Sequence, residues 1–169
     1  MEDKPAPACG FGPSLKGRAL RYLAQREHSR AELERKLAAH AESPEQLAQV
    51  LDELQAKDFI SEVRVVASVI NRRAAKFGAA RIRQELQGKG LAPDAVAEAV
   101  SSLKASEVER AREVWRKKFG QPAADAAASG KQMRFLLTRG FSADAVRRVL
   151  RDARNHGPDD DSADALESR

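Results

Sequence analysis

Apolar residues recur three and four positions apart through most of this chain. The group Leu47, Val50, Leu51 and Leu54 is typical, with charged and polar residues between its members. This spacing places side chains on one face of an α-helix, whereas a half-buried strand needs strict alternation. The pattern therefore predicts short amphipathic helices from residue 14 to about residue 155.

Capping signals mark where most of these helices begin. A Ser side chain can accept a hydrogen bond from an amide in the first helical turn, and a Glu or Gln three residues later can return the bond. The candidate pairs are Ser29–Glu32, Ser43–Gln46 and Ser106–Glu109, while Ser14 and Ser61 can cap on their own. Pro44 follows Ser43 at the first helical position, where proline loses no needed donor.

We expect nine helices. The first four start at Ser14, Ser29, Ser43 and Ser61, and the fourth of these runs to Lys76, before Gly78 stops it. The fifth is a short helix around Ile82 and Leu86. The last four are expected over Pro93–Leu103, Ser106–Phe119, 131–139 and 142–153. The Ala-rich stretch from Gly120 to Gly130 is expected to be a looser connector.

The helices repeat with a period near fifty residues. Leu86, Gly90 and Val96 return as Leu136, Gly140 and Val146, each 50 positions later, and a fainter copy precedes Leu86 by 49 positions. Such a period indicates stacked supersecondary units that share a continuous core. The predicted fold is all-α, with three tandem three-helix repeats in an elongated, curved stack. The expected boundaries are 14–57, 58–104 and 105–155, flanked by disordered tails at 1–13 and 156–169.

Two repeated glycines are expected to end short helices. Glycine adopts the left-handed conformation that closes a helix, and the next apolar residue then folds back onto the helix. Leu91 after Gly90, and Phe141 after Gly140, fit this ending. The first repeat has Ala41 in place of the glycine, so its turn should differ.

Charge is uneven along the chain. The net charge is +5, but residues 156–169 carry −4 and residues 1–13 carry −1, which leaves +10 on the helical body. A basic body suggests a polyanionic or acidic partner. The acidic tail is either inert or a decoy that covers the basic face.

Catalytic and metal sites are not expected. The histidines His28, His40 and His156 have no metal-ligand spacing, and the single cysteine, Cys9, allows no internal disulfide. Gly88-Lys89-Gly90 lacks the strand and the Ser or Thr of a phosphate loop. We predict no enzyme, no cofactor and no membrane span. Glu2, Asp3 and nearby prolines do not form a signal peptide, and a soluble cytoplasmic monomer is expected.

Basic side chains are the candidate binding residues. The candidates lie in the second and third predicted repeats and are Arg72, Arg73, Lys76, Arg81, Arg83, Lys89, Arg116, Lys117, Lys118, Arg134 and Arg139. Aromatic residues are only 5% of the chain, too few for a base-stacking platform. Any nucleic acid should therefore bind through backbone charge and be sensitive to salt.

Several ordered segments resemble the bacterial RecX family. They are ALRYLAQREHS at 19–29, DFISEVR at 58–64, FGAARIRQELQGKGL at 77–91 and RFLLTRGFS at 134–142. The resemblance covers about residues 14–153. It implies three tandem three-helix repeats and a regulator that binds the RecA recombinase filament on DNA, usually inhibiting strand exchange, ATP hydrolysis and co-protease activity. The family brings no catalytic residues.

Two other interpretations remain open at this point. The chain is either a filament regulator that lies along the filament groove and touches several protomers, or a helical repeat that binds DNA directly, or a general helical adaptor whose basic face is incidental. The pattern of residues does not decide between inhibition and assistance, nor between capping, groove binding and disassembly.

Overall fold

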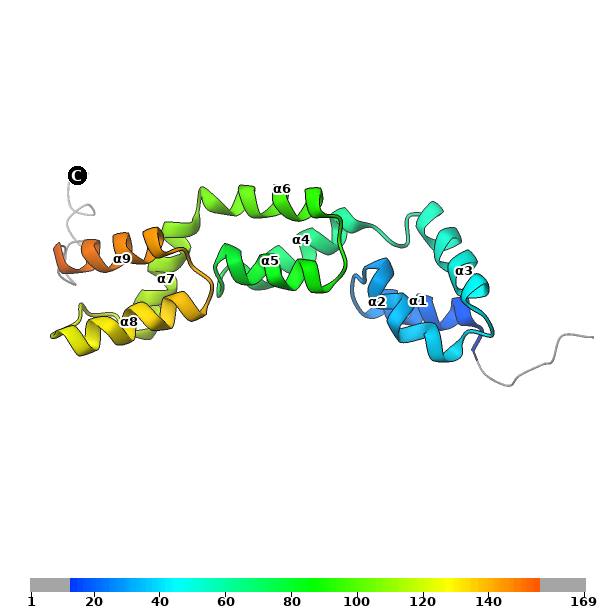
Figure 1. The fold of residues 1–169 in the computed structure, drawn as a ribbon, viewed down its shortest axis with the longest axis horizontal. Coiled ribbons are helices and arrows are strands. Elements are labelled where there is room, and N and C mark those ends of the chain that lie inside the picture. The colour runs from blue at the N-terminus through cyan, green and yellow to red at the C-terminus, as the bar shows by residue number, and fades with distance from the viewer. Residues whose placement is uncertain (1–12, 156–169) are drawn as a thin grey trace, which may run out of the picture. The chain divides into compact units, whose positions relative to one another are not determined.

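The computed structural model describes residues 13–155, and the two predicted tails lie almost wholly outside this range. Within it the chain forms nine α-helices, one short 3₁₀ turn and no strand, which confirms the all-α prediction. The helices are α1 (Leu15–Gln25), α2 (Arg30–Leu37), α3 (Pro44–Ala56), α4 (Glu62–Arg73), α5 (Ala79–Gly88), α6 (Pro93–Lys104), α7 (Glu107–Lys118), α8 (Ala126–Thr138) and α9 (Ala143–Asn155), and the 3₁₀ turn η1 spans Ala38–His40 (Figure 1).

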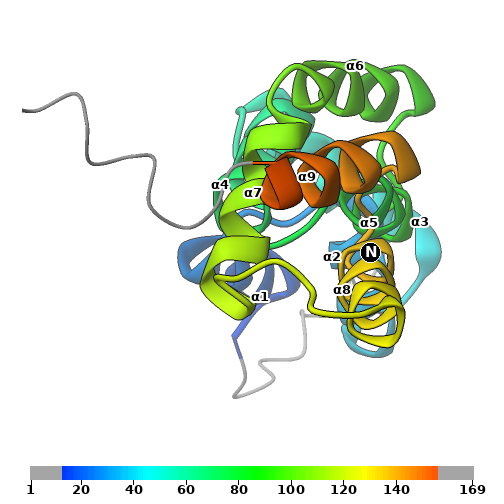
Figure 2. The same cartoon turned by 90° about the vertical axis from the view of Figure 1, so that its left-hand side faces the viewer.

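The helices form two compact units, the first ending at Ser61 and the second beginning at Glu62. The first unit holds α1 to α3, and the second holds the six helices α4 to α9. The second and third predicted repeats therefore belong to one body. Within it, α5 packs on α4 and α6, and α9 packs on α7 and α8, as Figure 2 shows for the third repeat.

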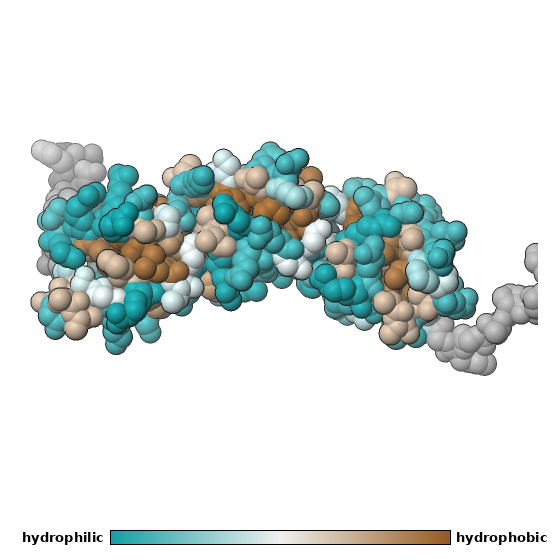
Figure 3. Space-filling model, in the orientation of Figure 1, coloured by the Kyte–Doolittle hydropathy of each residue, from teal (hydrophilic) through white to brown (hydrophobic). Residues whose placement is uncertain are grey.

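Each group of three helices has its own hydrophobic core. The largest fully buried apolar side chains are Leu33, Leu37, Leu51 and Leu54 in the first, Val65, Val69, Ile82 and Leu86 in the second, and Leu136, Val146 and Val149 in the third. These are the positions that the helical spacing marks as apolar. On the face drawn in Figure 3, hydrophilic residues cover most of each unit, and apolar residues show mainly in the seams between helices.

The helix starts confirm most of the predicted caps. Ser29 forms the complete capping box with Glu32, and Ser14 and Ser43 accept from the amides of Gly17 and Gln46. The second half of the Ser43 box is absent, because the Gln46 side chain accepts from the amide of Glu42.

The predicted capping box at Ser106 is wrong. Its hydroxyl accepts no cap bond from α7 and lies 3.5 Å from the carbonyl oxygen of Leu103, while Glu109 pairs with Arg112. Only two residues separate α6 from α7, so Ser106 keeps a backbone (φ −103°, ψ 6°) far from the extended form that a cap needs.

Two further boundaries differ from prediction. Helix α8 begins at Ala126 rather than 131, because the side chain of Asp125 caps the amide of Ala128 at 2.7 Å and the alanines that follow favour helix. Helix α4 ends at Arg73, three residues before the predicted Lys76.

The glycine-ended helices are confirmed. Gly90 and Gly140 have φ of +70° and +84°. After α8 the amide of Phe141 donates to Leu136 and the amide of Gly140 donates to Leu137, which is a complete Schellman ending. The short helix of the first repeat, α2, ends differently, as predicted: the 3₁₀ turn η1 follows it in place of the glycine.

Candidate interaction surface

The second and third repeats meet backbone against backbone at two glycines. The amide of Gly78 donates to the carbonyl of Arg139 at 2.9 Å, and the amide of Ala80 donates to Gly140 at 3.2 Å. A Cβ atom on Gly78 would lie 2.1 Å from the Gly140 oxygen, and one on Gly140 would lie 2.6 Å from the amide nitrogen of Arg81. The turn after α8 thus packs directly on the start of α5, as Figure 1 shows.

A buried carboxylate on α7 supports this junction from one side. Glu107 is only 8% exposed and accepts a bond from the amide of Ala79 at 3.3 Å. Its other oxygen accepts from the hydroxyl of Ser142 at 2.7 Å, and that hydroxyl accepts from the amide of Ala145. One side chain therefore fixes the starts of both α5 and α9.

A guanidinium on the same helix also supports the junction. Arg110 donates to the carbonyl oxygens of Ala74, Phe77 and Leu103 at 2.8–3.0 Å. Burial lowers the pKa of Arg110 below its ordinary value, and the Glu107 carboxylate acts in the opposite direction. The bonds to Ala74 and Phe77 order the connection between α4 and α5, and the bond to Leu103 joins it to α6.

A second guanidinium joins the two repeats at the surface. The Arg139 guanidinium lies 4.4 Å from the ring centre of Phe135 in its own repeat and 5.8 Å from that of Phe77 in the second repeat. It also donates to the carbonyl oxygen of Lys76 at 3.3 Å. Aromatic rings and a carbonyl attract the cation without cancelling its charge.

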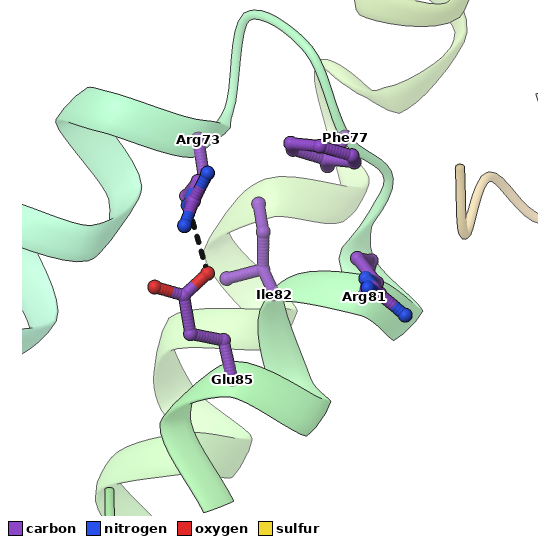
Figure 4. A pocket seen from close by; sticks show the side chains of 5 residues that line it. All are labelled: Arg73, Phe77, Arg81, Ile82 and Glu85. Atoms are coloured by element: carbon purple, nitrogen blue, oxygen red, sulfur yellow. Dashed lines mark ion pairs between the residues drawn. The ribbon is translucent and has the colours of Figure 1, made fainter. Parts of the chain in front are cut away.

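Beside this cation the second repeat has a shallow hollow of about 90 Å³. It is lined by Arg73, Phe77, Arg81, Ile82 and Glu85 (Figure 4). Arg73 pairs with Glu85 at 2.9 Å and lies 5.7 Å from the centre of the Phe77 ring. The lining combines cations, an apolar floor and one acid, so it can bind an anionic group but holds no nucleophile with a positioned base.

The structure brings three of the predicted binding residues together here, namely Arg73, Arg81 and Arg139, and the backbone carbonyl of Lys76 contacts Arg139. Arg72 is one residue from Arg73 at the end of α4, and Arg83 is exposed on α5. Arg134 is exposed on α8, and Arg116, Lys117 and Lys118 are exposed on the last turn of α7, where Arg116 pairs with Glu113. Lys89 is only 9% exposed, so we leave it out of the surface.

Residues that organise the junction were not among the predicted site residues. Glu107, Glu85 and Phe77 carry no sequence signal for this role, because their partners lie in other helices. The repeated Gly140 and the breaker Gly78 were the available signals, but each predicts only a local turn.

Two further findings concern metal binding and membrane spans. Among residues 13–155, no three His, Cys, Asp or Glu side chains gather as a metal site would require. Over the same residues, no helix has the length and apolar content to span a bilayer.

Family models match all three helical groups. Their descriptions are the first, second and third three-helix domains of RecX, and they match residues 16–54, 61–100 and 105–150 in that order. The three matched ranges correspond to the three hydrophobic cores.

Relatives and solved structures agree with these matches. Regulatory protein RecX of Leptothrix cholodnii is 60% identical over 149 residues, covering 88% of this chain and 94% of that protein. The protein of that name from Herminiimonas arsenicoxydans is 52% identical over 138 residues, covering 82% and 91%. The crystal structure of RecX from Lactobacillus salivarius has the same fold, with a TM-score of 0.73 at 22% identity over 84% of this chain and 96% of that one. The predicted resemblance is confirmed, and the chain belongs to the RecX family.

Proposed function

We propose that this protein binds the filament that a RecA-type recombinase forms on DNA, and that it inhibits the filament's ATP hydrolysis and strand exchange without catalysing a reaction. Its curated relatives are named regulatory proteins. The observation that carries the proposal is the group of three cations, Arg73, Arg81 and Arg139, at the junction of two repeats. We place the protein in the cytoplasm, as a monomer.

The proposed mechanism uses several weak contacts at once. A filament presents the same protomer surface repeatedly, and a chain of repeated helical groups can contact more than one protomer. Each further contact then benefits from a high effective concentration, so modest individual affinities add up. A regulator bound in this way holds neighbouring protomers in an inactive spacing or blocks further addition.

Charge reversal tests the basic surface. In the variant Arg72→Glu, Arg73→Glu and Arg81→Glu, we expect the concentration that half-inhibits DNA-dependent ATP hydrolysis to rise at least about tenfold, because attraction becomes repulsion. The matched control is Arg147→Glu, Arg148→Glu and Arg151→Glu on the exposed face of α9, which changes the net charge equally. Circular dichroism confirms that both variants fold. If the first variant inhibits as strongly as the parent, this surface is not the contact.

The second candidate function is direct binding to DNA. It is favoured by the net charge of +10 on the helical body, which suits a phosphate backbone. Under this alternative, the logarithm of the affinity for bare single-stranded DNA falls steeply with the logarithm of salt concentration. Each lost phosphate contact lowers that slope by about 0.7. The charge-reversed variant would then show a slope smaller by about 2, and the α9 control an unchanged slope.

A further inference from the structure

We propose that the hollow beside Phe77 receives an Asp or Glu side chain of the partner protein, and that Glu85 is the internal carboxylate which this side chain replaces. The inference rests on the proposed function, since it names the chemical group at the same surface. It adds a specific contact that the general basic character of the surface does not supply.

The donors around the hollow are arranged for a carboxylate. Guanidinium groups present a planar fork of N–H donors that matches the two oxygens of a carboxylate. Arg73 and Arg139 lie 5.7 and 5.8 Å from the ring centre of Phe77. Both are thus positioned before any partner arrives. Arg81, whose side chain donates to the exposed Gln84 at 3.3 Å, adds a third cation.

The internal pair shows that a carboxylate fits at this place. Glu85 meets the Nε atom of Arg73 at 2.9 Å, and the two side chains are 28% and 45% exposed. Pairs this exposed contribute little to stability, so an incoming carboxylate can replace Glu85 at small cost. Figure 4 shows Ile82 between Arg73 and Arg81, where its apolar surface can pack on the methylene groups of the incoming side chain.

A nucleic-acid base fits the same hollow less well. Two guanidinium groups already lie over the Phe77 ring, so a base must displace one of them in order to stack. The hollow has a volume of about 90 Å³, well below the roughly 300–1,000 Å³ of ligand pockets, which suits a single side chain.

The acidic run Asp159–Asp161 of this chain is a poorer occupant. Helix α9 starts at the junction and runs 13 residues to Asn155, about 20 Å from it. The run follows four to six residues later, and six residues extend at most about 20 Å. The run would therefore need a fully stretched return path.

The test uses the full chain and a fluorescein-labelled hexaglutamate peptide at low salt. Glu85→Gln removes the internal carboxylate but keeps its shape, so we expect about three- to fivefold tighter peptide binding. Glu98→Gln on the exposed face of α6 is the matched control for net charge. We expect it to change the affinity less than twofold. Arg81→Lys keeps the charge but loses the fork, and should weaken peptide binding about threefold.

Three outcomes would overturn the proposal. One is equal peptide affinity in Glu85→Gln and Glu98→Gln. Another is an equal gain by Glu85→Gln for oligo(dT), which would assign the hollow to nucleic acid. The third is a larger gain from neutralising Asp159, Asp160 and Asp161 to Asn, which would assign it to the chain's own tail. The peptide measurement needs no recombinase, so a parent protein that fails to bind the filament refutes the proposed function alone.

Discussion

The cations of Lys16 and Lys57 in the first unit and those of Arg110 and Arg139 at the junction in the second unit are held by different groups. In the first unit, Glu53 accepts from Lys16 at 2.6 Å and from Lys57 at 2.7 Å, so each ammonium faces a carboxylate. At the junction in the second unit, carbonyl oxygens hold Arg110, and aromatic rings with a carbonyl hold Arg139. Carbonyls and rings position a cation but leave its charge in place.

The comparison shows why net charge alone does not locate a binding surface. Cations elsewhere also form ion pairs. Arg30 pairs with Glu34 and Asp52. Arg112 pairs with Glu109 and Asp152. Such pairs reduce the local field. Arg110 and Arg139 at the junction are held mainly by neutral carbonyls and rings, so much of their charge stays in place. The acids nearby are Glu107 and Glu85, which pairs with Arg73. The junction is therefore where we expect an acidic partner to bind.

The largest expected effect comes from breaking the junction itself. Gly78→Ala places a Cβ atom 2.1 Å from the Gly140 oxygen, so the two backbones must separate. We expect the second unit to lose more than about 3 kcal/mol in its free energy of unfolding. Urea denaturation followed by Trp115 fluorescence reports on this unit.

Gly88→Ala is the matched control for that variant. Nothing lies within 4 Å of a Cβ atom there, and Gly88 ends α5 with a helical backbone. Alanine at this position should stabilise the protein by about 0.5 kcal/mol. Equal urea midpoints for the two alanine variants would contradict the described junction.

Removing the carboxylate that links α5 and α9 should have the next largest effect. Glu107→Ala leaves the Ala79 amide and the Ser142 hydroxyl without their acceptor, at a cost of about 2–3 kcal/mol. Glu107→Gln retains one acceptor and should lose about half as much. Chemical denaturation of both variants checks the order, and a loss below 0.5 kcal/mol for Glu107→Ala would argue against its linking role.

A pair of conservative substitutions sharpens the comparison between the two kinds of cation. Arg110→Lys loses the fork that reaches three carbonyls, so we expect a loss of about 1.5 kcal/mol. Arg112→Lys changes a guanidinium held by the carboxylates of Glu109 and Asp152, and should cost less than about 0.5 kcal/mol. Thermal unfolding compares the two losses of stability. A larger loss for Arg112→Lys than for Arg110→Lys would contradict the difference between the two kinds of cation.

The smallest effect concerns pH in the first unit. Hydrogen bonds from Lys16, then from Lys57, lower the pKa of Glu53 from 4.5 to about 2. A lowered carboxyl pKa contributes stability that is present above the ordinary value of 4.5 and is lost as the pH falls toward 2. Carbon NMR of the Glu53 carboxyl should show the low pKa, and Glu53→Gln should remove this part of the acid dependence. A carboxyl that titrates near 4.5 would show that the pairs do not persist in solution.

Local features of this fold could be predicted from sequence, because each depends on residues a few positions apart. The Ser29–Glu32 capping box and the turn at Gly140 are examples, since each is determined by residues next to it in the chain. The prediction at Ser106 was wrong because the spacing to Glu109 fits a capping box, whereas the backbone of Ser106, two residues after α6, does not have the extended conformation that a cap needs.

The candidate site was less predictable, because its groups are distant in sequence. The basic residues were identifiable as a set, but nothing in the chain marks Gly78 as the partner of Gly140, or Glu107 as the acceptor for Ala79 and Ser142. Such contacts depend on how the second repeat packs on the third. For the same reason, the composition could not show that Lys89 is buried and Arg81 is exposed.

Binding to the recombinase filament is the most direct test of the account. Fluorescence anisotropy should compare one labelled single-stranded DNA, first bare and then coated with recombinase and a slowly hydrolysed nucleotide, at the same salt concentration. We predict at least about tenfold tighter binding to the coated DNA, with the gain lost in the Arg72, Arg73 and Arg81 charge-reversed variant. Equal affinity for bare and coated DNA would contradict the account and favour direct DNA binding.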